Sequence, residues 1–345
     1  MFKPYFKYSD ALVNRLVEIT SAKDAVVNAY LVPKWEVSLR REALIKSAHA
    51  STSIEGNPLS LEQVSELAMG REVMATRRAK QEVLNYLKVL EDIERYLFDG
   101  AITEDSVLKL HAAVSREVLD DPRNEGSYRK VQVYVGNAVT GEVIFLPPPP
   151  EEVAGLMGDL VEWLASDAAA SMNPALVAGI AHYEFVRVHP FVDGNGRTAR
   201  ALATLVLVTR DFDIKRLFAL DDYYDSDRPL YYKALNDVDQ DTLDLTGWLD
   251  YFTSGVLVAI ARVRERVLHL SLDGRKRRQR GQLALTNRQI EILEGAIKDG
   301  RITSGDVARR YNISPQAARK ELRKMVGMDL LKRKGEGRAS HYVPA

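Results

Sequence analysis

The feature that most constrains this 345-residue chain is the stretch from His189 to Arg200, together with its flanks. It reads His-Pro-Phe-Val-Asp-Gly-Asn-Gly-Arg-Thr-Ala-Arg. Residues 198–209 are rich in Ala, Leu and Val and contain no Gly or Pro, which predicts a buried helix that begins near Arg197. Apolar residues at helical spacing in residues 177–188 predict a helix before the stretch as well. The sequence therefore predicts two helices joined by a glycine-rich loop.

The loop carries groups that can hold a phosphate. Gly194, Asn195 and Gly196 lie at the predicted helix start, where free backbone N–H groups and the positive end of the helix dipole attract an anion. Arg197 and Arg200 are three residues apart on the first turn, so both can reach that anion. The glycine spacing also fits a dinucleotide fingerprint, but that fingerprint follows a strand, and here a helix precedes. A P-loop is excluded because no Lys-Ser/Thr pair follows the glycines.

The same stretch resembles the signature of the Fic family, His-x-Phe-x-Asp/Glu-Gly-Asn-Gly-Arg-x-x-Arg. Every fixed position is met, by His189, Phe191, Asp193, Gly194, Asn195, Gly196, Arg197 and Arg200. The resemblance extends over roughly residues 35–255 and implies a mostly α fold. This fold is a Fic-type helical bundle with a β-hairpin flap, to which the sequence adds a small C-terminal winged helix domain.

The resemblance implies a protein adenylyltransferase that moves AMP from ATP to a Ser, Thr or Tyr hydroxyl of a target protein. His189 would be the general base for that hydroxyl. Asp193 would hold Mg²⁺ on the phosphates, because a carboxylate suits this cation. The glycine-rich backbone would stabilise the transferring phosphoryl group, and the two arginines would hold the outer phosphates. The remaining histidines are expected to be structural: His49, His111, His182, His269 and His341.

A second motif lies at the end of a helix predicted over residues 41–53. Residues 51–56, from Ser51 to Glu55 and Gly56, resemble the inhibitory motif found in part of the family, Ser/Thr-x-x-x-Glu-Gly/Asn. The resemblance implies that Glu55 binds Arg200 and holds it off the γ-phosphate, so that the enzyme restrains itself. Two other interpretations stay open. Glu55 and Gly56 can be a simple helix C-cap, or Glu55 can orient water for the removal of AMP from a modified target.

Two further segments are assigned through the resemblance. Residues 131–146 contain two β-rich runs around Gly and Asn, which predict a hairpin. In the family such a hairpin is a flap that holds the target segment by edge-strand pairing. Downstream, Tyr232 and then Asp239 are the candidates for contact with the adenine, whereas Tyr231 would face the core.

Charge divides the chain. Residues 273–345 hold 18 of the 48 Lys and Arg but 8 of the 48 Asp and Glu, which leaves 30 basic and 40 acidic residues in 1–272. We therefore expect an N-terminal helical region in 1–110, a Fic core in 111–272, a basic linker in 273–283 and a winged helix-turn-helix domain in 284–345.

The C-terminal part shows the pattern of three helices and a hairpin. Thr286 and Gln289 form a capping box, and Ser314 with Pro315 begins the last helix. That helix would expose Gln316, Arg319, Lys320 and Arg323, as a recognition helix does. Such a surface favours DNA as a partner, so the alternative to an enzyme is a transcription regulator whose Fic-like domain senses nucleotide. A winged helix used for docking or dimerisation is the other interpretation.

Composition narrows the setting. The chain has no cysteine, which excludes disulfides and thiolate chemistry. No apolar run approaches the roughly 20 residues of a membrane span, and the first residues lack a signal-peptide pattern, so we expect no membrane partner and a cytoplasmic location. The family resemblance also allows a homodimer and self-modification.

Overall fold

Two buried helices form the centre of this computed structural model. The structure describes residues 2–29, 31, 33–136, 143–212, 214–278, 286–328, 330–335 and 340–344. Helix α8 (Pro174–Val188) is buried throughout residues 175–185, and α9 (Asn195–Thr209) packs along it. Because both helices are apolar on nearly every side, other helices must surround them. The buried helices that the sequence predicted on either side of the loop are therefore confirmed.

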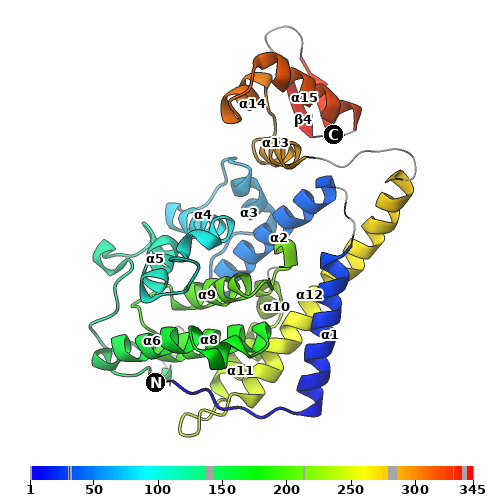
Figure 1. The fold of residues 1–345 in the computed structure, drawn as a ribbon. Coiled ribbons are helices and arrows are strands. Elements are labelled where there is room, and N and C mark those ends of the chain that lie inside the picture. Colours follow the sequence, from blue (N-terminus) through cyan, green and yellow to red (C-terminus); the bar gives the residue numbers. More distant parts are fainter. Residues whose placement is uncertain are drawn as a thin grey trace.

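The surrounding elements follow in chain order and place the central pair inside a helical bundle (Figure 1). Helix α1 lies beside α12 along their lengths. The elements before α8 are α1 (Asp10–Val27), α2 (Pro33–Ile54), α3 (Leu61–Ala68), α4 (Arg77–Glu91), η1 (Ile93–Tyr96), α5 (Glu104–Ser115), η2 (Pro122–Asn124), β1 (Val135–Gly136), β2 (Val143–Phe145), α6 (Pro150–Leu164) and α7 (Asp167–Ala170). Those between α9 and the C-terminal domain are η3 (Ile214–Arg216), α10 (Asp221–Ser226), α11 (Arg228–Asn236) and α12 (Thr246–Arg278).

The C-terminal domain has a hydrophobic cluster separate from that of the bundle. It comprises α13 (Asn287–Lys298), α14 (Ser304–Arg310), α15 (Pro315–Gly327) and the antiparallel pair β3 (Leu331–Lys334) and β4 (His341–Pro344). The predicted capping box of Thr286 and Gln289 opens α13, and Ser314 caps α15. Three helices and a hairpin are the elements of a winged helix, although assignment to that family of domains stays a prediction.

Three boundaries differ from those predicted. Helix α2 begins at Pro33, eight residues before the expected start. Helix α12 continues to Arg278, so the first part of the expected linker 273–283 is helical, because its basic residues are good helix formers. Where the structure describes the flap, Val135 pairs with Phe145 and Gly136 with Val143, so residues 131–134 of the predicted first strand precede this pairing. Residues 137–142 at its tip and 279–285 of the linker lie outside the described residues.

Across the described ranges, none of the helices combines the length and apolar character needed to span a bilayer.

Candidate active site

His189 caps the C-terminus of α8 in the left-handed conformation, at φ 49° and ψ 58°. Its backbone N–H donates to the carbonyl of Phe185 at 3.0 Å, and its ring Nδ1–H donates to the carbonyl of Val186 at 3.3 Å. This bond selects the tautomer in which Nε2 carries the lone pair. Burial lowers the pKa of His189, so the ring is neutral near pH 7. The residue is therefore in the form a general base requires.

The side chain of Asn195 closes the loop, and the prediction that the residue contributes to phosphate binding through its backbone stays a prediction. Its Nδ2 donates to the carbonyl of Phe191 at 2.8 Å, and its Oδ1 accepts from the N–H of Phe191 at 2.9 Å. Both side-chain atoms therefore bond Phe191 and help to close the loop. The backbone N–H of Asn195 lies in the first turn of α9, where it can contribute to anion binding.

His111 holds the loop from the opposite side, and the sequence did not single it out. Its ring stacks on Phe191 with centroids 3.6 Å apart. Its Nδ1 accepts from the N–H of Gly126 at 3.0 Å, so Nε2–H donates to the carbonyl of Asp193 at 2.9 Å. Burial lowers the pKa of His111 to about 4, which keeps the ring in this neutral form. The sequence offered no signal, because the partners are 15 to 82 residues away.

The start of α9 can accept an anion. Gly194 is left-handed at φ 79°, and the first-turn amides of Asn195, Gly196 and Arg197 have no acceptor within the helix. Arg197 is 2% exposed, and its nearest carboxylate oxygens, on Glu82 and Asp193, are both 3.6 Å away. Among the described residues, Nε and Nη1 of Arg197 have no hydrogen-bond partner. Buried donors of this kind are costly, and a phosphate would satisfy them.

Arg200 is held by the end of α2, as the sequence predicted. Its Nη2 donates to Oε1 of Glu55 at 2.8 Å and to the carbonyl of Ser51 at 2.7 Å, and its Nε donates to Oγ of Ser51 at 2.7 Å. Asp221 lies 3.5 Å away on the other side. Burial opposes the charge, but these acidic neighbours raise the pKa of Arg200 above its ordinary value.

Glu55 lies directly over the glycine-rich loop. A Cβ on Gly196 would overlap Oε1 of Glu55, so a larger residue there would displace the carboxylate from this position. The carboxylate thus occupies space at the start of α9, next to the amides that can bind an anion. The side chain of Glu55 remains 34% exposed, so its outer side is open to solvent.

Asp193 is the acidic residue on the loop. Its Oδ1 accepts from the N–H of Gly194 at 2.5 Å, and its Oδ2 accepts from Arg78 at 3.3 Å. In the described part of the chain no group of three His, Cys, Asp or Glu could hold a metal by itself. One exposed carboxylate beside a phosphate site still fits Mg²⁺, which uses one or two carboxylates together with substrate phosphates.

Of the two residues predicted to contact adenine, Tyr232 lies against the end of α2 near the loop, whereas the Asp239 side chain bonds within its own turn. The Tyr232 hydroxyl donates to the carbonyl of Ile54 at 3.3 Å, so it contacts the end of α2, and the residue is 42% exposed. Tyr231 faces the core and bonds His182, as expected. Oδ1 of Asp239 accepts from Thr242 and Asp241 in its own exposed turn, which lowers the pKa of Asp239. Contact of either residue with adenine stays a prediction.

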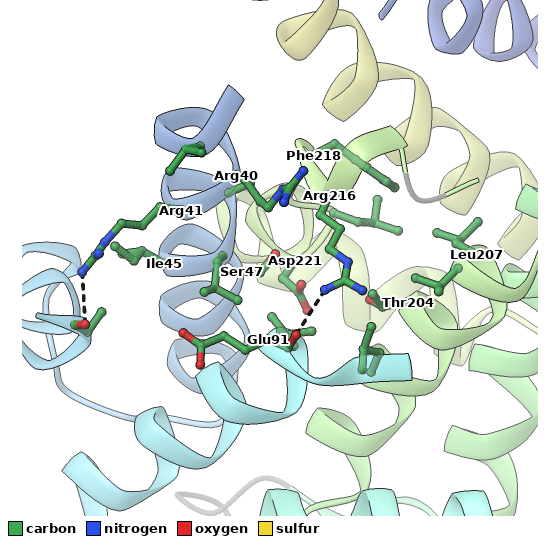
Figure 2. Close-up of a pocket in the computed structure, with 18 of the residues that line it drawn as sticks. Arg40, Arg41, Ile45, Ser47, Glu91, Thr204, Leu207, Arg216, Phe218 and Asp221 are labelled. Carbon is green, nitrogen blue, oxygen red and sulfur yellow. Dashed lines mark hydrogen bonds between the residues drawn. The ribbon is translucent and has the colours of Figure 1, made fainter. Parts of the chain in front are cut away.

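A cavity of about 320 Å³ lies elsewhere, behind α2, and does not include the catalytic loop. Figure 2 shows Arg216 reaching the end of α4 and Arg41 reaching away toward α3. The polar groups on its walls bind one another or nearby backbone, as Arg40 does with Glu294 of α13. The site chemistry therefore belongs to the loop and not to this cavity.

The bundle and its loop define a Fic-fold protein. Residues 101–207 match the model of the Fic/DOC family. Curated relatives called "Protein adenylyltransferase Fic" include that of Drosophila grimshawi, 34% identical over 203 residues, and that of Drosophila willistoni, 34% identical over 209 residues. These alignments cover 56% and 57% of this chain and 39% of each relative, so the chain spans about two fifths of their length.

Solved structures agree with this assignment of the fold. The crystal structure of a Fic family protein from Desulfovibrio desulfuricans G20 has a TM-score of 0.66 at 24% identity, and covers 100% of this chain and 98% of that one. Fic-1 (residues 134–508) from C. elegans has a TM-score of 0.59 at 26% identity, and covers 75% and 73%.

Proposed function

We propose that this chain is a protein adenylyltransferase that transfers AMP from ATP to a hydroxyl of a target protein. The observation that carries the proposal is the pairing of His189, whose Nε2 is available as a base, with the start of α9 and the unsatisfied donors of Arg197. Similarity to curated relatives called adenylyltransferases supports it.

The residues divide the reaction between them. Nε2 of His189 takes the proton as the target oxygen attacks the α-phosphorus of ATP. The bond between this phosphorus and the bridging oxygen breaks, and pyrophosphate leaves. The first-turn amides of α9 and the guanidinium of Arg197 bind phosphate oxygens as charge shifts among them. Asp193 would hold Mg²⁺, which would neutralise phosphate charge when bound.

The geometry of Arg200 supports the proposal that Glu55 restrains the enzyme. While Arg200 donates to Glu55 and Ser51, it is not available to a γ-phosphate. ATP bound in this arrangement would present its α-phosphate badly to a hydroxyl, and misplacement of this order costs about a hundredfold in rate. We therefore place Ser51 and Glu55 in an inhibitory role.

Three variants test the proposal by mass spectrometry of adenylate added to the protein itself or to lysate proteins, with ATP and Mg²⁺. E55G should increase labelling about a hundredfold, because it releases Arg200. H189A in the E55G background should abolish labelling. E72G changes an exposed loop glutamate to the same residue and should match the parent. Equal labelling by E55G and the parent at saturating ATP would contradict the proposed restraint. Labelling that persists in H189A would contradict the proposal that His189 is the base of an adenylyltransferase.

Removal of AMP is the second candidate activity, favoured by the partly exposed carboxylate of Glu55 beside the loop. In that reaction Glu55 would orient a water molecule. Release of AMP from a purified adenylylated target by the parent but not by E55G would identify it.

A nucleic-acid partner is proposed for the C-terminal domain on a separate observation. Four polar residues of α15 are exposed together, as the sequence predicted: Gln316, Arg319, Lys320 and Arg323. Under this proposal the chain would also serve as a regulator at DNA. The homodimer and the cytoplasmic location stay predictions.

A further inference from the structure

We propose that Arg129 is a positioning residue that fastens the flap to the catalytic loop, and so sets where a hydroxyl held by the flap meets His189. The inference rests on the proposed function for its catalytic consequence. The fastening itself is a property of the fold and can be measured without turnover.

Arg129 is a buried cation, 2% exposed. Burial lowers the pKa of its guanidinium, and no carboxylate of the described residues contributes to the shift. A buried charge without an ionic partner needs hydrogen bonds in place of water. Backbone carbonyl oxygens accept these hydrogen bonds here, so the guanidinium is bound to backbone groups.

The guanidinium joins three segments. Nε donates to the carbonyl of His189 at 2.9 Å. Nη1 donates to the carbonyl of Val131, where the chain enters the flap, at 3.1 Å. Nη2 donates to the carbonyl of Pro148, where the chain leaves the flap, at 2.5 Å, with Val188 at 3.4 Å. One planar group therefore contacts both legs of the flap and the catalytic loop.

The bond to His189 bears on the catalytic residue directly. His189 adopts a left-handed conformation that residues with a Cβ rarely take, so its peptide needs support. The guanidinium holds its carbonyl, and the N–H of Arg129 donates to the carbonyl of Pro190 at 2.9 Å. A cation at the C-terminal end of α8 is also favoured by the helix dipole.

The two legs of the flap are held together mainly by contacts near Arg129. Among the described residues its strands pair at Val135 with Phe145 and at Gly136 with Val143, and an isolated two-stranded hairpin is marginal by itself. Apart from Arg129, Nε2 of Gln132 joins the legs by donating to the carbonyl of Pro147 at 3.0 Å. Loss of the guanidinium should therefore release the flap and the loop together.

The arrangement requires arginine. Its donors are fixed in one plane and point toward several acceptors at once, whereas lysine offers a single ammonium point. R129K keeps the charge and loses the bridge, and R129Q loses both. K130Q removes a charge from the exposed neighbouring residue and serves as the matched control.

Hydrogen–deuterium exchange tests the fastening. In R129K and R129Q, peptides from both legs of the flap and from residues 189–195 should exchange about tenfold faster, while peptides of α12 keep the parent's rate and K130Q matches the parent throughout. Acceleration confined to the flap, or to the loop, or absent from both, would overturn the proposal. If R129Q does not fold, the exchange of R129K decides the question.

Kinetics in the E55G background tests the consequence. R129K should lower kcat for transfer to the target about a hundredfold, whereas the Kd of ATP should change less than twofold, because the phosphate donors belong to α9. An unchanged kcat would contradict the positioning role. If E55G itself transfers no AMP, the proposed function fails, and the exchange result still decides whether Arg129 couples the two segments.

Discussion

At the scale of single residues, the chemistry of the loop depends on which polar atoms packing leaves available. The Asn195 side chain hydrogen-bonds the backbone of Phe191, and both ring nitrogens of His111 hydrogen-bond backbone groups. By contrast, Nε2 of His189 and two nitrogens of Arg197 remain available. Residues of one motif therefore differ in whether their side-chain polar atoms remain available.

The ionisation of His189 can be measured directly. We expect a neutral ring protonated on Nδ1 at pH 7, with a pKa below the ordinary value of about 6.5 because of burial. Adenylate transfer should consequently fall only as the pH drops below that value, when the base becomes protonated. Long-range ¹H–¹⁵N NMR of the free protein, assigned with H189Q, reports both tautomer and titration. An Nε2-protonated ring, or a midpoint above the ordinary value of about 6.5, would contradict this expectation.

At the scale of elements, α8 buries a histidine among the helices that surround it. His182 is fully buried, accepts or donates one hydrogen bond with the Tyr231 hydroxyl at 2.9 Å, and lies against Tyr224 and Phe252. Burial lowers its pKa to about 3. The unfolded chain binds this proton near pH 6.5, whereas the folded chain does not until far lower pH. The contribution of neutral His182 to the free energy of unfolding is therefore fully present above pH 6.5 and decreases as the pH falls below that value.

This difference in proton binding between the folded and unfolded chain sets a slope of the free energy of unfolding against pH. From pH 6.5 to pH 5, His182 alone should remove about 2 kcal/mol from the free energy of unfolding, at about 1.4 kcal/mol per pH unit. H182Q should lose that much less over the same interval. Urea denaturation followed by tryptophan fluorescence at each pH measures it. An equal slope in H182Q and in the parent would show that His182 is not the responsible group.

At the scale of the whole molecule, charge and packing divide the chain in the same place. The bundle and the C-terminal domain have separate hydrophobic clusters, and the basic excess lies in residues 273–345. Contact between them includes Arg40 of α2 with Glu294 of α13 at 3.3 Å, a partly exposed pair that contributes about 0 to 1 kcal/mol. The two parts can therefore meet different partners.

The nucleic-acid proposal belongs to this scale. If α15 contacts phosphates, the double variant R319Q/R323Q should weaken binding of a short duplex and reduce the slope of log affinity against log salt by about two. R301Q/R309Q removes the same two charges at exposed positions outside α15 and should have a smaller effect. Electrophoretic mobility at several salt concentrations measures both. A duplex whose mobility is unchanged by micromolar parent protein at low salt would exclude this partner.

Most of what could be predicted of the fold and the site came from short patterns in the sequence. The loop of residues 189–200, the flanking buried helices and the exposed face of α15 could be inferred from the residues, because a helix start, a capping residue or an apolar period is contained within one turn or one motif. The pairing of Glu55 with Arg200 came from family resemblance, since no local pattern joins residues 145 apart.

The amino-acid sequence alone determined which groups could do chemistry and on which helices they lie. Tertiary structure decided which of those groups are available, because hydrogen bonds between distant segments consume some and leave others. His111 and Arg129 bond the loop across 82 and 60 residues, and the side chain of Asn195 closes the loop by bonding Phe191. Such assignments depend on desolvation, which exists only once the helices have packed.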